Sequence, residues 1–259
     1  GAPGAGTAAP PAGARLHAAG PEPVDASRRR SDHAGVTTLD RYHLLLPPRG
    51  LGVHLARNPV TASQALASSP RARVALDGVM FDNCDPAGRG YAASSCGDPD
   101  YLLFDARRGV NEPSRYPERG GTISVVGDRC VVSDGASVAR GATVAVQAYP
   151  TLVRGGEARG FGDERSRQRV WRAAVGSARG GGRVLLAVAL MPLGDFASWC
   201  LDVGGEDVFY TDGGGSCRMQ WPGGAWVGSA EDRRVPSFLL WEEPRLGARE
   251  ASVAAALLV

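Results

Sequence analysis

The sequence predicts a single α+β domain with a mixed, largely antiparallel sheet and a few packed helices. Short apolar segments alternate with Gly- and Pro-rich turns along most of the 259 residues. Residues 171–178 and 183–190 form the clearest hairpin, because the Arg-Gly-Gly-Gly segment between them favours a tight turn. Residues 193–203 form the clearest amphipathic helix, with apolar side chains recurring at the helical period. A hydrophobic content of 43% is sufficient for a substantial core.

The first 35 residues differ in composition from the rest of the chain. They are mainly Ala, Gly, Pro and Arg, with almost no large apolar side chains, so they cannot bury enough surface to offset the entropy of ordering. We expect residues 1–35 to form a flexible leader, of the kind left after a signal peptide is removed. Residues 36–259 are expected to form the domain.

Besides the hairpin and the amphipathic helix, the domain is expected to contain further strands and one short helix. Residues 42–46 and 51–55 are expected strands separated by the turn Pro-Pro-Arg-Gly, and residues 61–68 are an expected short helix. The turn signatures Gly-Asp at 127–128 and Ser-Asp-Gly at 133–135 separate later strands. Residues 73–81 are expected to be a strand-to-loop junction, and the other expected strands are residues 98–105, 122–126, 129–132, 143–148, 207–210 and 235–241.

Composition excludes several classes of function. The net charge is only +2, and no segment interleaves basic and aromatic residues as a nucleic-acid surface would, so a nucleic-acid partner is not expected. All 29 basic residues are Arg, which excludes a Walker A loop, a Schiff-base lysine and a Ser-Lys dyad. No run of 18 apolar residues is present, so we expect no membrane span.

The five cysteines leave two interpretations open. They stand at positions 84, 96, 130, 200 and 217 without a Cys-x-x-Cys pair, which disfavours zinc ribbons and thioredoxin-like redox sites. Disulfides joining Cys84 to Cys96 and Cys200 to Cys217 would each close a loop. Buried free thiols are the alternative.

Residues 210–219, Tyr-Thr-Asp-Gly-Gly-Gly-Ser-Cys-Arg-Met, are the most informative segment for function. Three glycines after a carboxylate let the backbone approach a ligand closely, where its N–H groups can receive an anion. The apolar residues 207–210 predict a buried strand that delivers this loop to a sheet edge. A simple tight turn between two strands is the other interpretation.

The order of four segments resembles the phosphodiester glycosidase family. Residues 171–176, Trp-Arg-Ala-Ala-Val-Gly, and then Asp-Gly-Gly-Gly-Ser at 212–216 are similar to an Arg-Thr-Ala-Ile-Gly-like strand and a Leu-Asp-Gly-Gly-Gly-Ser-like loop of that family. Residues 74–82 look like its Ala-Ile-Asn-Gly-Gly-Phe-Phe segment, and residues 146–156 look like its Gly-Pro-x-Leu-Val-x-Asp-Gly segment. The resemblance spans residues 73–219.

This resemblance implies hydrolysis of a sugar-1-phosphodiester, with breakage of the glycosyl C1–O bond and departure of a phosphate monoester. A phosphate monoester leaves more readily than an alkoxide, so strong general-acid assistance is less necessary than in an ordinary glycosidase. The implied partner is a carbohydrate or glycosyl-phosphate substrate, such as a surface polysaccharide, and no cofactor is implied. The implied location is secreted or in the cell envelope, or on a virion, and the oligomeric state stays open.

The resemblance also assigns roles to particular residues. Asp212 is the expected catalytic carboxylate or the residue that orients the attacking water, with Asp77 or Asp82 as its partner. Arg172 is the expected phosphate clamp, because a guanidinium binds phosphate oxygens bidentately and stays charged. The expected substrate-binding residues lie in the loop and in the two upstream segments: Gly213, Gly214, Ser216, Phe81, Asp82 and Gln147.

Three departures from the family pattern keep a second hypothesis open. Asp77 stands where the family usually has Asn, Val79 where it has Gly, and Ala173 where it has Thr. An ionised Asp77 would repel a phosphate, whereas a protonated one could still donate a hydrogen bond. The alternative function is a catalytically silent carbohydrate-binding or structural module with the same fold, for example on a virion surface.

Other catalytic schemes fit the sequence less well. All four histidines precede the segments that carry the resemblance, and Gly-Gly-Ser-Cys-Arg at 214–218 lacks the final Gly of a serine-hydrolase elbow. Cys217 has no nearby His in sequence to activate it as a nucleophile. Residues 82–85, Asp-Asn-Cys-Asp, lack the alternating spacing of a calcium loop, so we expect a polar turn and no metal site.

Overall fold

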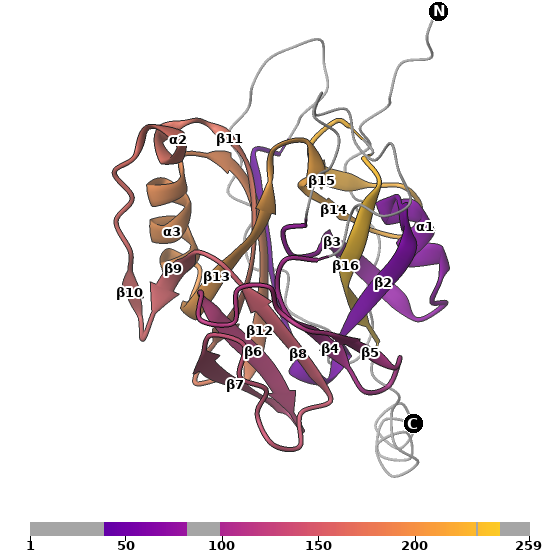
Figure 1. The fold of residues 1–259 in the computed structure, drawn as a ribbon. Coiled ribbons are helices and arrows are strands. Elements are labelled where there is room, and N and C mark those ends of the chain that lie inside the picture. The colour runs from indigo at the N-terminus through magenta and orange to yellow at the C-terminus, as the bar shows by residue number, and fades with distance from the viewer. Residues whose placement is uncertain (1–38, 82–98, 232, 244–259) are drawn as a thin grey trace, which may run out of the picture.

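A computed structural model describes residues 39–81, 99–231 and 233–243 (Figure 1). The strands form three sheets, and every pairing between named strands is antiparallel. The expected α+β architecture with largely antiparallel pairing is therefore confirmed. The leader proposed for residues 1–35, the cysteines at 84 and 96, and Asp82 lie outside the described residues.

The six-stranded sheet contains the hairpin that the sequence predicts. Its order is β1 (Arg41–Leu46), β12 (Arg183–Met191), β11 (Val170–Ala178), β13 (Gly205–Gly213), β9 (Thr151–Arg154) and β10 (Glu157–Ala158). Strands β11 and β12 pair without interruption from Val170 opposite Met191 to Ala178 opposite Arg183. The turn between them has positive φ at Arg179, Gly180 and Gly181, which explains its glycine content.

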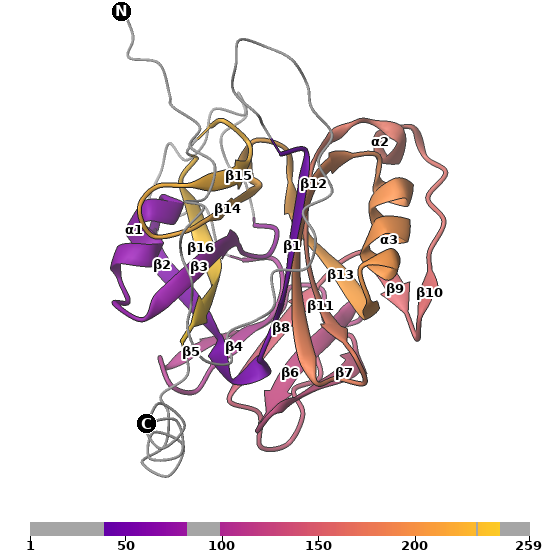
Figure 2. The same ribbon diagram turned by 180° about the vertical axis from the view of Figure 1, so that it is seen from behind.

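The other two sheets each have five strands. The β3 sheet has the order β15 (Trp226–Gly228), β14 (Arg218–Gln220), β3 (Ala72–Asp77), β16 (Val235–Glu242) and β2 (Leu51–Val60). The β8 sheet has the order β5 (Val110–Glu112), β4 (Leu103–Asp105), β8 (Val144–Ala148), β6 (Gly121–Val126) and β7 (Arg129–Asp134). Figure 2 shows the three sheets from behind.

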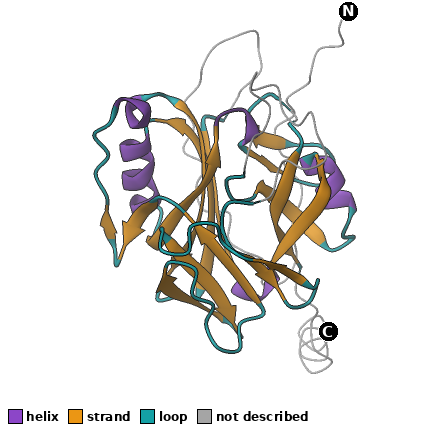
Figure 3. Ribbon diagram, viewed as in Figure 1, coloured by secondary structure: helices purple, strands orange, loops and turns teal. Residues whose placement is uncertain are grey.

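Helices lie at the periphery, and each has a local reason to form (Figure 3). Thr61 and Gln64 form a capping box that starts α1 (Ala62–Ala67), and Asp163 caps α2 (Glu164–Arg167) by accepting a hydrogen bond from the Ser166 N–H. Helix α3 (Leu193–Asp202) buries one apolar face, as the sequence predicts. Two single 3₁₀ turns, Pro48–Gly50 and Gly214–Ser216, complete the helical elements of the described residues.

Three apolar clusters hold the layers together. The largest contains side chains from all three sheets, including Leu76 of β3, Val146 of β8 and Leu186 of β12. A second lies between α3 and the outer face of the six-stranded sheet, and a third lies between α1 and the β3 sheet. Helices α3 and α1 therefore cover opposite sides of the molecule (Figure 1). Burial of this apolar surface is the main stabilising contribution.

The Cys200–Cys217 disulfide considered from the sequence does not form. Cys130, Cys200 and Cys217 are all buried free thiols. Cys200 belongs to the cluster beneath α3, whereas Cys217 belongs to the largest cluster, which contacts the other face of the six-stranded sheet. The sheet therefore separates the two sulfur atoms, and the free-thiol interpretation is correct for these residues.

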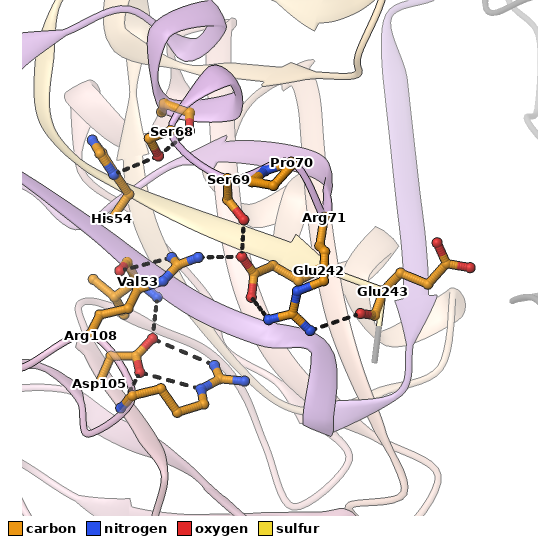
Figure 4. A network of polar contacts seen from close by, with 12 residues as sticks. Val53, His54, Ser68, Ser69, Pro70, Arg71, Asp105, Arg108, Glu242 and Glu243 are labelled. Atoms are coloured by element: carbon orange, nitrogen blue, oxygen red, sulfur yellow. Dashed lines mark hydrogen bonds and ion pairs between the residues drawn. The ribbon is translucent and has the colours of Figure 1, made fainter. Parts of the chain in front are cut away.

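A buried ionic network joins the β3 sheet to the β8 sheet (Figure 4). Glu242, at the end of β16, accepts hydrogen bonds from Ser69 and Arg108, and its other oxygen lies 3.3 Å from Nη2 of Arg71. Nη1 of Arg108 donates to the Val53 carbonyl at 3.2 Å. Asp105, fully buried at the end of β4, accepts from the Val53 N–H at 3.0 Å. The buried carboxylates Glu242 and Asp105 thus have partners within the protein, and no ligand is needed to explain their burial.

No helix within the described ranges is long and apolar enough to cross a membrane.

Candidate active site

The glycine loop lies where the ends of β13 and β3 meet. The Met80 N–H, just beyond β3, donates to the Thr211 carbonyl of β13 at 2.9 Å, and β14 leaves the loop to pair with β3. A Cβ at Gly213 would lie 2.0 Å from the Tyr210 hydroxyl oxygen and 2.8 Å from the Trp171 carbonyl oxygen. Gly214 has a φ of +66°. Position 213 therefore has no room for a side chain, and the backbone conformation at position 214 requires glycine.

Asp77 is the last residue of β3 and is fully enclosed, with 1% of its surface exposed. One carboxyl oxygen accepts a hydrogen bond from the Arg218 N–H at 3.3 Å. The other, Oδ2, is buried and has no hydrogen-bond partner. Burial, followed by the nearby Asp212 charge, raises the pKa of Asp77 well above its ordinary value, although the Arg218 N–H opposes the shift.

Asp212 is half-buried and has more polar support than Asp77. Its Oδ1 accepts a hydrogen bond from the Gly213 N–H at 2.7 Å. Burial raises the pKa of Asp212 to about 7, against the stabilising effects of the Gly213 N–H, the Arg233 charge and the Ser216 hydroxyl. Asp212 is therefore poised to change protonation state near neutral pH.

The two carboxyl groups interact strongly enough that both cannot easily ionise. Asp212 has a cation and two hydrogen-bond donors to stabilise its negative charge, whereas Asp77 has one backbone donor and an unpartnered oxygen. The environment therefore keeps the proton on Asp77 and leaves Asp212 as the carboxylate. Such separation of roles between two neighbouring acids is typical of hydrolytic active sites.

Arg172 lies opposite Gly213 in the pairing of β11 with β13, but its side chain has partners other than those that a phosphate clamp requires. Its Nη2 donates to the Arg165 and Gln168 carbonyls at 3.3 and 3.2 Å, at the end of α2. Nη1 lies 3.4 Å from the Tyr210 hydroxyl. The guanidinium is buried, its Nη1 and Nη2 make these contacts, and its Nε has no hydrogen-bond partner. Arg172 therefore ties α2 to the strand that carries the loop.

Arg233 is the cation that sequence reasoning missed. It lies before β16, its charge lowers the pKa of Asp212, and its Cζ is 5.8 Å from the centre of the Phe81 ring. Nε and Nη2 of Arg233 are buried without a hydrogen-bond partner. No sequence motif marks this residue, because its position depends on β16 returning to the β3 sheet.

Cys217 lies within electrostatic range of all three residues expected to be catalytic. Burial raises the pKa of its thiol well above the ordinary value, Asp77 and Asp212 raise it further, and Arg172 opposes them. The charges of Asp77, Asp212 and Arg172 therefore all act on this thiol. A thiol with a raised pKa stays protonated, so Cys217 is unsuited to be the nucleophile.

The remaining expected site residues divide into two groups. Gly213, Gly214 and Ser216 form the loop, and Phe81 underlies Arg233. Gln147 is fully buried in β8, and its amide binds the Leu102 N–H and the carbonyls of Tyr116 and Arg119. These backbone contacts use its polar atoms and account for its burial without a sugar.

Two of the three family departures fall in the core. Val79 and Ala173 are both buried in the largest apolar cluster. They change packing at these positions, whereas Asp77 alone among the three carries a titratable group beside Asp212.

Replacing Asp77 with Asn tests the buried acid. Because the folded-state pKa of Asp77 is raised, native stability is expected to fall as pH rises from about 4, where the unfolded carboxyl ionises, towards the raised pKa. At pH 8, Asp77→Asn should raise the free energy of unfolding by about 1–3 kcal/mol, and at pH 4 the two proteins should differ little. Urea denaturation at both pH values measures this difference.

Asp105→Asn is the matched control, because Asp105 is equally buried but accepts hydrogen bonds from the N–H groups of Val53 and Arg107, both at 3.0 Å. It should lower stability. A loss of stability for Asp77→Asn at pH 8 would contradict the assignment of Asp77 as an unfavourably buried acid.

Comparison with known proteins agrees with the fold. A family model described as phosphodiester glycosidase matches residues 106–257, more than half of the sequence. The chain therefore belongs to the phosphodiester glycosidase family. A comparison with curated proteins gives no match.

Solved structures with the same fold have low sequence identity. The auto-inhibited catalytic domain of zebrafish N-acetylglucosamine-1-phosphodiester alpha-N-acetylglucosaminidase matches with a TM-score of 0.52 and 14% identity, covering 83% of this chain and 87% of that one. A hypothetical protein from Synechocystis has a TM-score of 0.51 and 13% identity, covering 83% and 61%. A putative exported protein from Burkholderia pseudomallei has a TM-score of 0.50 and 16% identity, covering 78% and 74%.

Proposed function

We propose that the protein hydrolyses a sugar-1-phosphodiester at the glycosyl C1–O bond. Water supplies the hydroxyl group to C1, and the phosphate leaves as a monoester that keeps the bridging oxygen. The observation that carries this proposal is the placement of two carboxyl groups at the glycine loop: Asp77 is buried with an unpartnered Oδ2, and Asp212 accepts a hydrogen bond from the Gly213 N–H. Membership of the phosphodiester glycosidase family supports it.

Asp212 is the carboxylate of the proposed reaction. It assists attack at C1 either by accepting the proton of the attacking water or by attacking C1 itself, and its charge stabilises the oxocarbenium-like transition state. The Gly213 N–H and the Ser216 hydroxyl hold the carboxylate in place. Because the leaving phosphate is already a weak base, no strong acid is required on its side.

Asp77 acts as a neutral hydrogen-bond donor in this scheme. A protonated carboxyl group donates one hydrogen bond, as the amide of Asn does, whereas a carboxylate only accepts. Its unpartnered Oδ2 is the atom available for this role. The Asp at this position is therefore compatible with an anionic substrate for as long as it keeps its proton.

The test is turnover of glycosyl methyl phosphodiesters, with N-acetylglucosamine 1-(methyl phosphate) and its hexose counterparts as probes. We expect the native chain to release methyl phosphate, and ³¹P NMR monitors this release. The value of kcat/KM should rise with pH, with a midpoint near 7, as Asp212 ionises. Absence of turnover across the panel would refute the hydrolase. Glycan binding without release would instead favour the silent binding module.

We also propose that the protein acts outside the cytoplasm, on a glycoconjugate or surface polysaccharide. The fold match to a putative exported protein supports this location.

A further inference from the structure

The side chain of Arg233 is in an unusual electrostatic position. Nε and Nη2 of its guanidinium are buried, yet neither forms a hydrogen bond. Arg233 also forms no ion pair with any residue in the part of the chain that the structure describes. Since Arg stays charged, two donors have lost water without gaining a protein acceptor. Such an arrangement costs free energy unless an anion supplies the missing acceptors.

The neighbours of Arg233 specify where that anion would lie. The Phe81 ring, 5.8 Å from Cζ, fixes one side of the guanidinium. Asp212 is near enough for the Arg233 charge to lower its pKa, without an ion pair between them. Met80, the residue before Phe81, donates its N–H to the carbonyl of Thr211, the residue before Asp212. An acceptor bound to the free donors of Arg233 would therefore lie in the neighbourhood of the carboxylate proposed to act at C1.

Other charges around the loop do not supply this acceptor. Glu231 is exposed, and its Oε2 is 2.5 Å from where a Cβ of Gly215 would be. Asp100 raises the pKa of Asp212 and lies 3.9 Å from Nη1 of Arg115. Arg172, another buried cation nearby, already donates to two backbone carbonyls through Nη2, and only its Nε is buried without a partner. Arg233 has two such unpartnered nitrogen atoms and is thus the better-placed cation for a ligand.

We infer that Arg233 binds the phosphodiester group of the substrate and holds the leaving phosphate next to Asp212. A guanidinium with two free donors matches two phosphate oxygens, and it neutralises the repulsion between that phosphate and the Asp212 carboxylate. This inference rests on the proposed function, because it names the substrate's anionic group at the same site. It assigns phosphate recognition to Arg233 in place of Arg172.

Dimethyl phosphate is the probe that tests phosphate recognition without requiring turnover. A ³¹P NMR titration of the native chain should show binding, and Arg233→Gln should raise Kd roughly 10- to 100-fold through loss of charge-assisted hydrogen bonds. Arg233→Lys, which keeps the charge but loses the fork of donors, should fall between them. Arg234→Gln is the matched control because the neighbouring Arg234 is exposed, and it should bind as the native chain does.

Thermal unfolding separates phosphate recognition from a structural role. Removing an unpartnered buried cation should leave Tm unchanged or raise it, so a marked loss of Tm in Arg233→Gln would identify a structural residue instead. No binding by the native chain, or equal binding by Arg233→Gln, would overturn the inference. Binding that depends on Arg233 without any hydrolysis would refute the proposed function alone.

Discussion

Asp212→Asn is expected to lower kcat on glycosyl methyl phosphodiesters by roughly 100- to 10,000-fold, the range attributed to a positioned acid or base. The substitution keeps the shape of the side chain and an oxygen that can accept from the Gly213 N–H. It removes the negative charge that the Arg233 guanidinium and the Ser216 hydroxyl stabilise. Initial rates from pH 5 to 9 measure the effect, and any residual rate should lose the rise centred near pH 7.

The control for this substitution is Asp202→Asn, at the exposed end of α3. It changes the same functional group away from the loop and should leave kcat within about twofold of the native value, as expected for a surface position. Equal rates for Asp212→Asn and Asp202→Asn would remove Asp212 from the mechanism. Dimethyl phosphate binding by Asp212→Asn should persist, because Arg233 is intact.

Much of the fold could be predicted because its main elements have local signals. The β11–β12 hairpin has two long apolar strands and a glycine turn, and α3 has a clear apolar face. The short strands β5, β9, β10, β14 and β15 have two to four residues each, so no periodicity could mark them. They form by pairing with neighbouring strands whose backbone groups would otherwise be unpaired.

The candidate site could be predicted only for residues that belong to recognisable sequence segments. Asp212 and its glycines form one motif, and a second resembling segment located Asp77. Arg233 lies outside these segments, and its proximity to Asp212 arises from tertiary structure. Gln147 and Arg172 are the opposite case. Both lie in segments that resemble the family, but their side chains donate hydrogen bonds to backbone carbonyls of the protein. Hydrogen-bond partners, which sequence does not reveal, distinguish these cases.

Glu242→Gln is expected to lower the free energy of unfolding by about 3–5 kcal/mol, the cost of leaving a buried charge without its partner. Glu242 is 5% exposed and receives hydrogen bonds from Ser69 and Arg108 (Figure 4). The variant retains the size of the side chain but leaves Arg108, whose side chain is 23% exposed, without its counterion. Because Arg108 also holds the Val53 carbonyl, the junction between two sheets loses support.

The neighbouring Glu243→Gln provides a matched comparison, measured by urea denaturation at neutral pH. Glu243 pairs with Arg73 at 2.9 Å, but both side chains are largely exposed, so its loss should cost no more than about 1 kcal/mol. Replacing Glu242 and Arg108 together by Met should cost less than Glu242→Gln alone, since the only charge then left without this partner is Arg71, whose side chain is 42% exposed. Similar small losses for Glu242→Gln and Glu243→Gln would mean that water reaches this network and that it does not fasten the β3 sheet to the β8 sheet.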